Sequence, residues 1–158
     1  MSPLGIKKHP DKVLRIQCEV IKNVTEKERN IFDDMLFTMR HFCGIGLAAP
    51  QIGISKRLIV ASVEDITIKL ANPEILDING SDMMMEGCLS VANTTVGIKR
   101  PATITVKGLN EENEVIELKT GGLLARVLQH EIDHLNGRLI IDYMSLLSRL
   151  KLNVKNSM

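Results

Sequence analysis

Residues 122–137 read GLLARVLQHEIDHLNG, and this stretch has the pattern of a largely buried helix. At about 100° per residue, one narrow helical face carries Leu123, Val127, His130 and His134. The remaining leucines and Ile132 cover the neighbouring face, so the apolar arc is wide. Gly137 is well placed to end the helix, because glycine adopts the left-handed conformation without steric cost.

The helix also carries a metal-binding pattern, His130-Glu131-Ile132-Asp133-His134. Histidines four residues apart lie one turn apart, so both imidazoles can reach one ion while Glu131 projects beside them. Two unpartnered histidines on an apolar face would be costly to desolvate, which favours a metal site over coincidence. The residues after His134 contain no His or Cys, so a third ligand is expected upstream.

Two upstream segments carry further candidate site residues. Cys88 lies in EGCLS, residues 86–90, where Gly87 lets the backbone approach closely. An isolated cysteine is usually a small buried hydrophobe, but beside a histidine pair it is the softest ligand available. Residues 44–51, GIGLAAPQ, have almost no side-chain bulk. A ligand or a neighbouring strand could therefore pack against their backbone, or the segment could be a tight helix-to-strand connection. Gln51 offers an amide that can donate to an oxygen.

The rest of the chain predicts an α+β fold. Thr25 and Glu28 form a capping-box pattern that begins a helix over about 26–42, ended by Gly44. Apolar, β-branched runs predict strands at Arg57–Val63, Ile66–Leu70, Thr103–Lys107 and Glu114–Leu118, the last two antiparallel. A third short helix is expected at Met144–Leu152. Helices set apart from mostly antiparallel strands are typical of an α+β domain.

Composition limits the functional classes. The chain has 158 residues, 44% hydrophobic and 25% charged, which predicts one globular domain over 1–158. A net charge of +1 and only 3% aromatics argue against a nucleic-acid partner. No apolar run reaches the roughly 18 residues of a membrane span, and no signal peptide is expected. Three scattered cysteines fit a reducing setting, so we expect a cytoplasmic protein.

Taken together and in this order, GIGLAAPQ, EGCLS and HEIDH resemble the motifs of the peptide deformylase family. The resemblance implies antiparallel β-sheets packed around the helix that carries HEIDH. It implies one divalent metal held by Cys88, His130 and His134, ferrous iron natively, with Zn²⁺, Ni²⁺ or Co²⁺ as substitutes. The implied reaction removes formate from the N-terminal formylmethionine of nascent polypeptides.

The resemblance also implies residue roles. A metal-bound hydroxide would attack the formyl carbon, with Glu131 as general base and then acid. The Gln51 amide and the backbone N–H of Leu89 would form the oxyanion hole. An extended peptide would lie along Ile45 and Gly46, and an apolar pocket would hold the methionine side chain. The full set of expected substrate-binding residues is Ile45, Gly46, Met84, Gly87 and Val127.

Three smaller expectations concern the surroundings of the site. Arg100 is expected to pair with Asp133 or another acid of the histidine helix. Cys43 adjoins Gly44 and so could lie near the site, but we expect it to be buried and inert. In the family, contact with the ribosome near the exit tunnel is linked to a C-terminal extension. The tail after Ser145 is short, so the sequence supports catalysis more strongly than it supports ribosome contact.

Two alternatives compete with a formyl-peptide hydrolase. A non-catalytic metal-stabilised or peptide-binding module would need neither Glu131 nor Gln51, and structural zinc sites prefer four protein ligands rather than three. A metallopeptidase would not be expected to take an upstream ligand such as Cys88 or to have a narrow, formyl-sized cavity.

Overall fold

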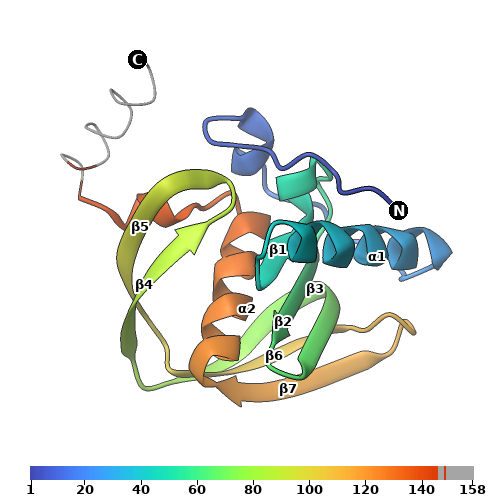
Figure 1. Ribbon diagram of the computed structural model, residues 1–158. Helices are drawn as coiled ribbons and strands as arrows, with labels where there is room; N and C mark the ends of the chain where they lie inside the picture. The colour runs from blue at the N-terminus through green and yellow to red at the C-terminus, as the bar shows by residue number, and fades with distance from the viewer. Residues whose placement is uncertain (146–147, 149–158) are drawn as a thin grey trace.

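The computed structural model, which describes residues 1–145 and 148, contains two antiparallel β-sheets and two α-helices (Figure 1). The larger sheet has the strand order β1-β2-β3-β6-β7. Its strands are β1 (Gly46–Ala48), β2 (Leu58–Val63), β3 (Ile66–Asn79), β6 (Thr103–Leu109) and β7 (Val115–Gly121). The smaller sheet is a hairpin of β4 (Asp82–Cys88) and β5 (Val91–Arg100). The helices are α1 (Glu26–His41) and α2 (Gly122–Leu135), with short 3-10 turns η1 (Lys12–Arg15), η2 (Ala49–Ile52) and η3 (Ile140–Tyr143).

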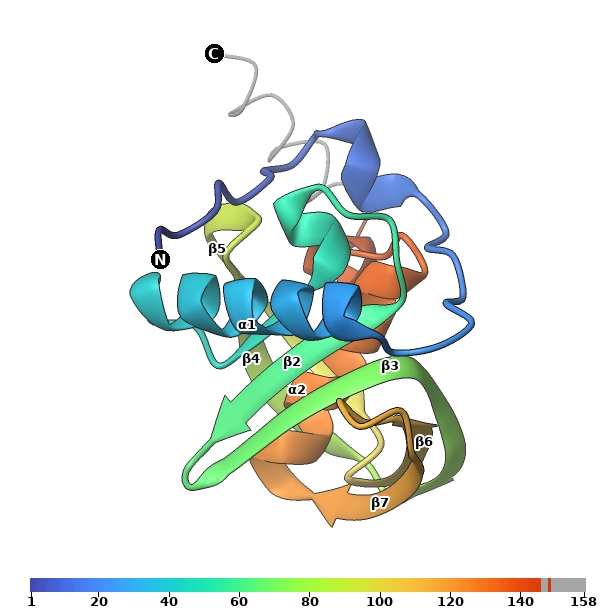
Figure 2. The same ribbon diagram turned by 90° about the vertical axis from the view of Figure 1, so that its right-hand side faces the viewer.

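Strand β2 is apolar and buried over residues 58–61, because both of its faces are covered there. Leu58 and Val60 pack in a core cluster with α1, whereas Ile59 and Ala61 pack with α2. Figure 2 shows α1 lying across one side of the large sheet, with α2 on the other. A strand covered on both faces loses the usual alternation of apolar and polar residues.

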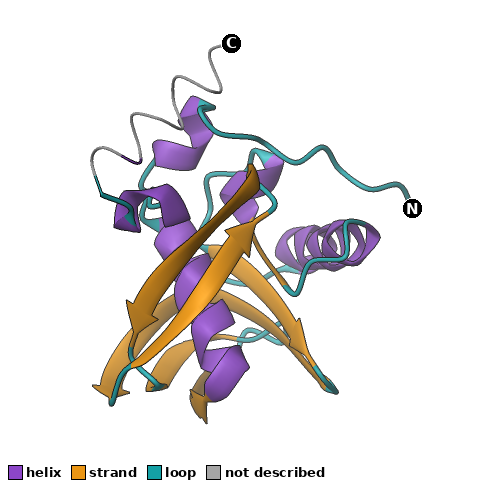
Figure 3. Cartoon of the chain, turned by 60° about the vertical axis from the view of Figure 1, so that its left-hand side comes forward, coloured by secondary structure: helices purple, strands orange, loops and turns teal. Residues whose placement is uncertain are grey.

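Helix α2 lies between the large sheet and the β4–β5 hairpin (Figure 3). On the hairpin side, a separate core cluster joins β5 to η1 and to the segment after α2. Its fully buried members are Leu14, Val91, Val96, Ile98, Leu139, Ile140 and Ile141. The hairpin is therefore anchored by η1 and by the segment after α2, which helps to position the end of β4 beside α2.

Most of the predicted elements are confirmed. The α+β prediction holds, and α1 begins where expected, with the Glu28 carboxylate accepting from the Thr25 N–H at 3.0 Å. Helix α2 ends as predicted, since Gly137 has a left-handed φ of 73°. Strands β6 and β7 pair antiparallel. Within the described residues, no helix combines the length and apolar character needed to cross a bilayer.

Three strands were not predicted, and three others are longer than expected: β6 and β7 by two residues each, and β3 by much more. Strand β1 has only three residues, and β4 and β5 are the two long strands that the pattern missed. Strand β4 shows no alternation of buried and exposed residues, because it contains three consecutive exposed methionines, Met83, Met84 and Met85. Its hydrogen-bonded pairing with β5, and not burial of one face, maintains the strand. Strand β3 continues past Leu70 to Asn79 through two irregularities in its pairing with β6. The helix expected at Met144–Leu152 lies largely outside the described residues.

Candidate metal centre

The tertiary fold brings the three predicted ligands together. Helix α2 carries His130 and His134, and Cys88 is the last residue of β4. The thiol sulfur and one nitrogen of each ring lie within 4.8 Å of one another. One of these contacts joins Cys88 Sγ and His134 Nε2 at 3.4 Å. One thiolate and two imidazoles form a donor set that suits several divalent transition metals.

The electrostatics of the centre fit a cation. Burial lowers the pKa of His134 well below 6.5, which keeps this ring in the neutral form that binds metals. Among the described residues, His134 Nδ1 and Glu131 Oε2 are buried side-chain atoms without a hydrogen-bond partner. Burying a carboxylate oxygen without a hydrogen bond is costly, so this atom is expected to contact a cation or the water bound to it. The residues present therefore fit a divalent metal.

His130 is oriented by Glu86. This residue is the first of the EGCLS motif, and it was not among the predicted site residues. The ring Nδ1 lies 2.9 Å from Glu86 Oε1. Because an ionised carboxylate can only accept, we assign the Nδ1 proton to this bond, which leaves Nε2 for a metal. Burial alone would lower the pKa of His130, but Glu131, Cys88 and Glu86 raise it well above 6.5. A cation at this ring therefore competes with a proton.

Two buried arginines hold the Glu86 carboxylate in its ionised form. Arg100 donates to it through Nε at 2.6 Å and Nη2 at 2.9 Å, and Arg126 donates through Nη1 at 2.5 Å. Burial alone would raise the pKa of Glu86, but the hydrogen bonds with His130 and Arg100 outweigh it and lower the pKa to about 2. Glu86 thus remains an acceptor for the metal-ligand ring.

The same arginines join α2 to the hairpin. Arg126 also donates to the carbonyls of Ile98 at 2.9 Å and Asp82 at 2.8 Å. Arg100 donates to Asp133 at 2.9 Å, which confirms the expected pairing. Arg126 was not among the predicted site residues, although a charge within the apolar arc of a buried helix indicates a buried acidic partner.

Glu131 and Gln51 are both buried beside the three ligands. Burial raises the pKa of Glu131 to about 7. The Gln51 amide is fixed at both ends, because its Oε1 accepts from the Ala48 N–H at 2.9 Å and its Nε2 donates to Ser90 Oγ at 3.1 Å. The amide nitrogen also lies 3.7 Å from Cys88 Sγ. One of its two hydrogens therefore goes to Ser90, and the other is donated toward the Cys88 sulfur at the edge of the site.

Gly46 is required by close packing against this carboxylate. A Cβ at position 46 would lie 2.6 Å from Val127 Cγ1 and 3.0 Å from Glu131 Oε2. Both distances are too short for ordinary contacts, so β1 approaches α2 only because residue 46 has no side chain. The small residues of GIGLAAPQ therefore serve close approach of a strand to the site.

A cavity of about 580 Å³ opens onto the centre between β1, the hairpin and α2. Nearly all of the predicted site residues line it, namely Ile45, Gly46, Gln51, Met84, Gly87, Cys88, Leu89, Val127, His130 and Glu131. Its lining also includes Cys43, which is exposed. The expectation that Cys43 is buried was wrong, because this residue lies in the turn between α1 and β1, where it lines the open cavity.

These features define the class of protein. A helix bearing two histidines and a glutamate, a cysteine on a neighbouring strand that could complete a metal site, and an adjoining cavity are the parts of a metallohydrolase. The comparisons with known proteins agree. The family model described as polypeptide deformylase matches residues 3–150. The chain belongs to this family.

Individual relatives show how extensive the similarity is. A peptide deformylase of Thermodesulfovibrio yellowstonii is 46% identical over 154 residues, covering 94% of this chain and 93% of the relative. The crystal structure of peptide deformylase from Ehrlichia chaffeensis in complex with actinonin has a TM-score of 0.95 at 38% identity, covering 99% of this chain and 98% of that one. The enzyme from Thermotoga maritima has a TM-score of 0.87 at 41% identity, covering 90% and 97%.

Proposed function

We propose that this enzyme removes the formyl group, as formate, from the N-terminal formylmethionine of newly made polypeptides. The observation that carries the proposal is the convergence of Cys88, His130 and His134 within 4.8 Å at the cavity, beside the buried Glu131. A divalent cation held by these three residues would act as a Lewis acid and lower the pKa of water in the site.

The residues around the centre suit the hydrolysis of a formyl amide. Glu131 would take the proton of the attacking water and then deliver it to the leaving amine. The amide nitrogen of Gln51 and the backbone N–H of Leu89 would donate to the formyl oxygen as negative charge develops there. This role for Gln51 is supported by its fixed orientation, since preorganised donors stabilise charge without reorganising.

The substrate peptide would lie extended along β1. This strand stands at the end of the large sheet's strand order, and Ile45 and Gly46 line the cavity. Backbone pairing to an edge strand depends little on the side chains of the bound peptide, which suits an enzyme that acts on many nascent chains. Met84, Gly87 and Val127 line the same cavity, and its apolar side chains would hold the methionine side chain.

The donor set leaves several metals chemically suitable, and we infer ferrous iron natively, with Zn²⁺, Ni²⁺ or Co²⁺ as functional replacements. Action on nascent chains would place the enzyme in the cytoplasm, close to the ribosomal exit.

Formate release from formyl-Met-Ala tests the proposal. The protein is loaded anaerobically with Fe²⁺ or Ni²⁺, its metal content is measured, and acetyl-Met-Ala serves as the control for acyl size. We expect turnover of the formyl peptide and little of the acetyl peptide. A fully metallated protein that releases no formate would refute the proposal and favour a binding module. Cleavage of the Met-Ala bond would instead identify a metallopeptidase.

A further inference from the structure

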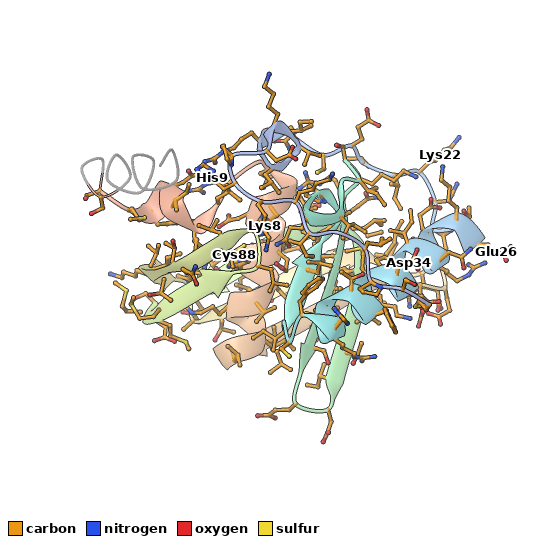
Figure 4. The ribbon with its side chains drawn as sticks, turned by 45° about the horizontal axis from the view of Figure 1, so that its top comes forward. Lys8, His9, Lys22, Glu26, Asp34 and Cys88 are labelled. Carbon is orange, nitrogen blue, oxygen red and sulfur yellow. The ribbon has the colours of Figure 1, made fainter. Side chains whose placement is uncertain are left out.

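Three consecutive residues near the N-terminus bind backbone carbonyls beside the metal centre. We call Lys7, Lys8 and His9 the strap. The Lys7 N–H donates to the Gln51 carbonyl at 2.7 Å, and the His9 N–H donates to the Ser90 carbonyl at 2.8 Å. Between them, the Lys8 ammonium donates to the Leu89 carbonyl at 2.7 Å. In Figure 4, Lys8 and His9 lie close to Cys88.

The carbonyls of Leu89 and Ser90 belong to the tight turn between β4 and β5. Because Cys88 pairs with Val91, the turn consists of Leu89 and Ser90 alone. Both of its carbonyls accept from the strap, and the Ser90 hydroxyl accepts from Gln51. The strap, the turn and Gln51 therefore form one connected set of hydrogen bonds, and both proposed oxyanion donors belong to it.

We propose that Lys8 is a positioning residue for the oxyanion hole. Its ammonium holds the Leu89–Ser90 turn so that the Leu89 N–H points at the oxygen on which charge develops. This inference rests on the proposed function. Among the hydrogen bonds of the described residues, Lys8 alone in the strap uses its side chain to bind the turn or Gln51. Substitution can therefore remove this bond while leaving the backbone bonds of Lys7 and His9 in place.

The expected kinetic signature follows from the place of the oxyanion in the reaction. A donor that is misaligned loses more in the transition state, where the oxygen is charged, than in the ground state. Loss of the Lys8 contact should therefore lower kcat and change KM little. If Lys8 only stabilised the fold, its substitution would not lower kcat selectively in enzyme that is fully folded and metallated.

The test compares Lys8→Met with Lys8→Arg and with Lys12→Met, which removes the same charge from an exposed site in η1. We expect Lys8→Met to lower kcat about 3- to 10-fold with KM within about twofold, the scale of one charge-assisted hydrogen bond at a solvent-accessible site. Lys8→Arg keeps the charge and the donor, so it should recover most of kcat, and Lys12→Met should match the unsubstituted enzyme. Metal content should be the same in all four proteins.

Hydrogen–deuterium exchange gives a second readout that does not depend on activity. Lys8→Met should increase exchange in the segment 87–91 of the metal-free protein, whereas Lys12→Met should not. Equal kcat and equal exchange in Lys8→Met and the unsubstituted protein would overturn the inference, as would an equal loss in Lys12→Met. If the unsubstituted enzyme releases no formate, the proposed function fails, while the exchange data still decide whether Lys8 holds the turn.

Discussion

Glu86 Oε1 lies 2.9 Å from His130 Nδ1, so a carboxylate on β4 contacts an imidazole on α2 that is a proposed metal ligand. Glu86 is two residues before Cys88 on the same strand. One side chain therefore links the strand that carries the proposed sulfur ligand to the helix that carries both proposed nitrogen ligands. Arg100 and Arg126 bind this carboxylate from the hairpin and the helix, and they hold it in place.

Substitution of Glu86 should weaken metal binding. Glu86→Gln keeps the shape but loses the charge that orients the His130 ring, and we expect metal affinity to fall about 10- to 100-fold, as for other partners of metal-bound histidines. Competition with a chelator measures the change. Glu112→Gln, in the exposed β6–β7 turn, is the matched control. Unchanged affinity in Glu86→Gln would show that this carboxylate does not tune the site.

Glu131 should be dispensable for metal binding and necessary for turnover. Glu131→Ala removes the proposed proton carrier, and we expect kcat to fall about 10²- to 10⁴-fold, the usual contribution of general acid–base catalysis. Elemental analysis of the same sample should show unchanged metal content. A variant with full metal and ordinary formate release would remove the assigned role.

Gly46 should not tolerate a side chain. In Gly46→Ala the new methyl group meets Val127 and Glu131, so β1 must move away from α2. We expect a loss of about 1–3 kcal/mol in the free energy of unfolding, typical of overpacking, together with lower kcat. Gly5→Ala is the control, since a Cβ there meets nothing within 4 Å. Equal stability and activity in the two variants would contradict the close packing.

The start of α1 should contribute stability that depends on pH. Burial alone would raise the pKa of Glu28, but hydrogen bonds from Thr25 and the charge of Lys56 lower it below 4.5. A lowered pKa means that the contribution is present above 4.5 and is lost as the pH falls through the folded-state value. Glu28→Gln should therefore cost about 1 kcal/mol near neutral pH and clearly less in acid. Urea unfolding at the two pH values measures both, and a difference that does not change with pH would contradict the assignment.

The parts of the site that were predicted are those set by local geometry or by the family resemblance. His130 and His134 had to share a face, because residues four apart on a helix always do. The end of α2 at Gly137 and the pairing of β6 with β7 follow from local signals of the same kind. Cys88 was chosen by chemistry and resemblance, since nothing local places it beside α2.

The remaining features depended on packing between distant segments. Strand β4 has no burial pattern of its own, so pairing with β5 and anchorage by α2 decide its path and with it the position of Cys88. The contacts of Arg126 with Glu86 and of Lys8 with Leu89 join residues far apart in the chain. The sequence by itself determined the helix and its two imidazoles, because helical spacing is a property of the backbone. Only the tertiary structure decided which sulfur, carboxylate and carbonyl meet them, because those contacts depend on how the sheets close around that helix.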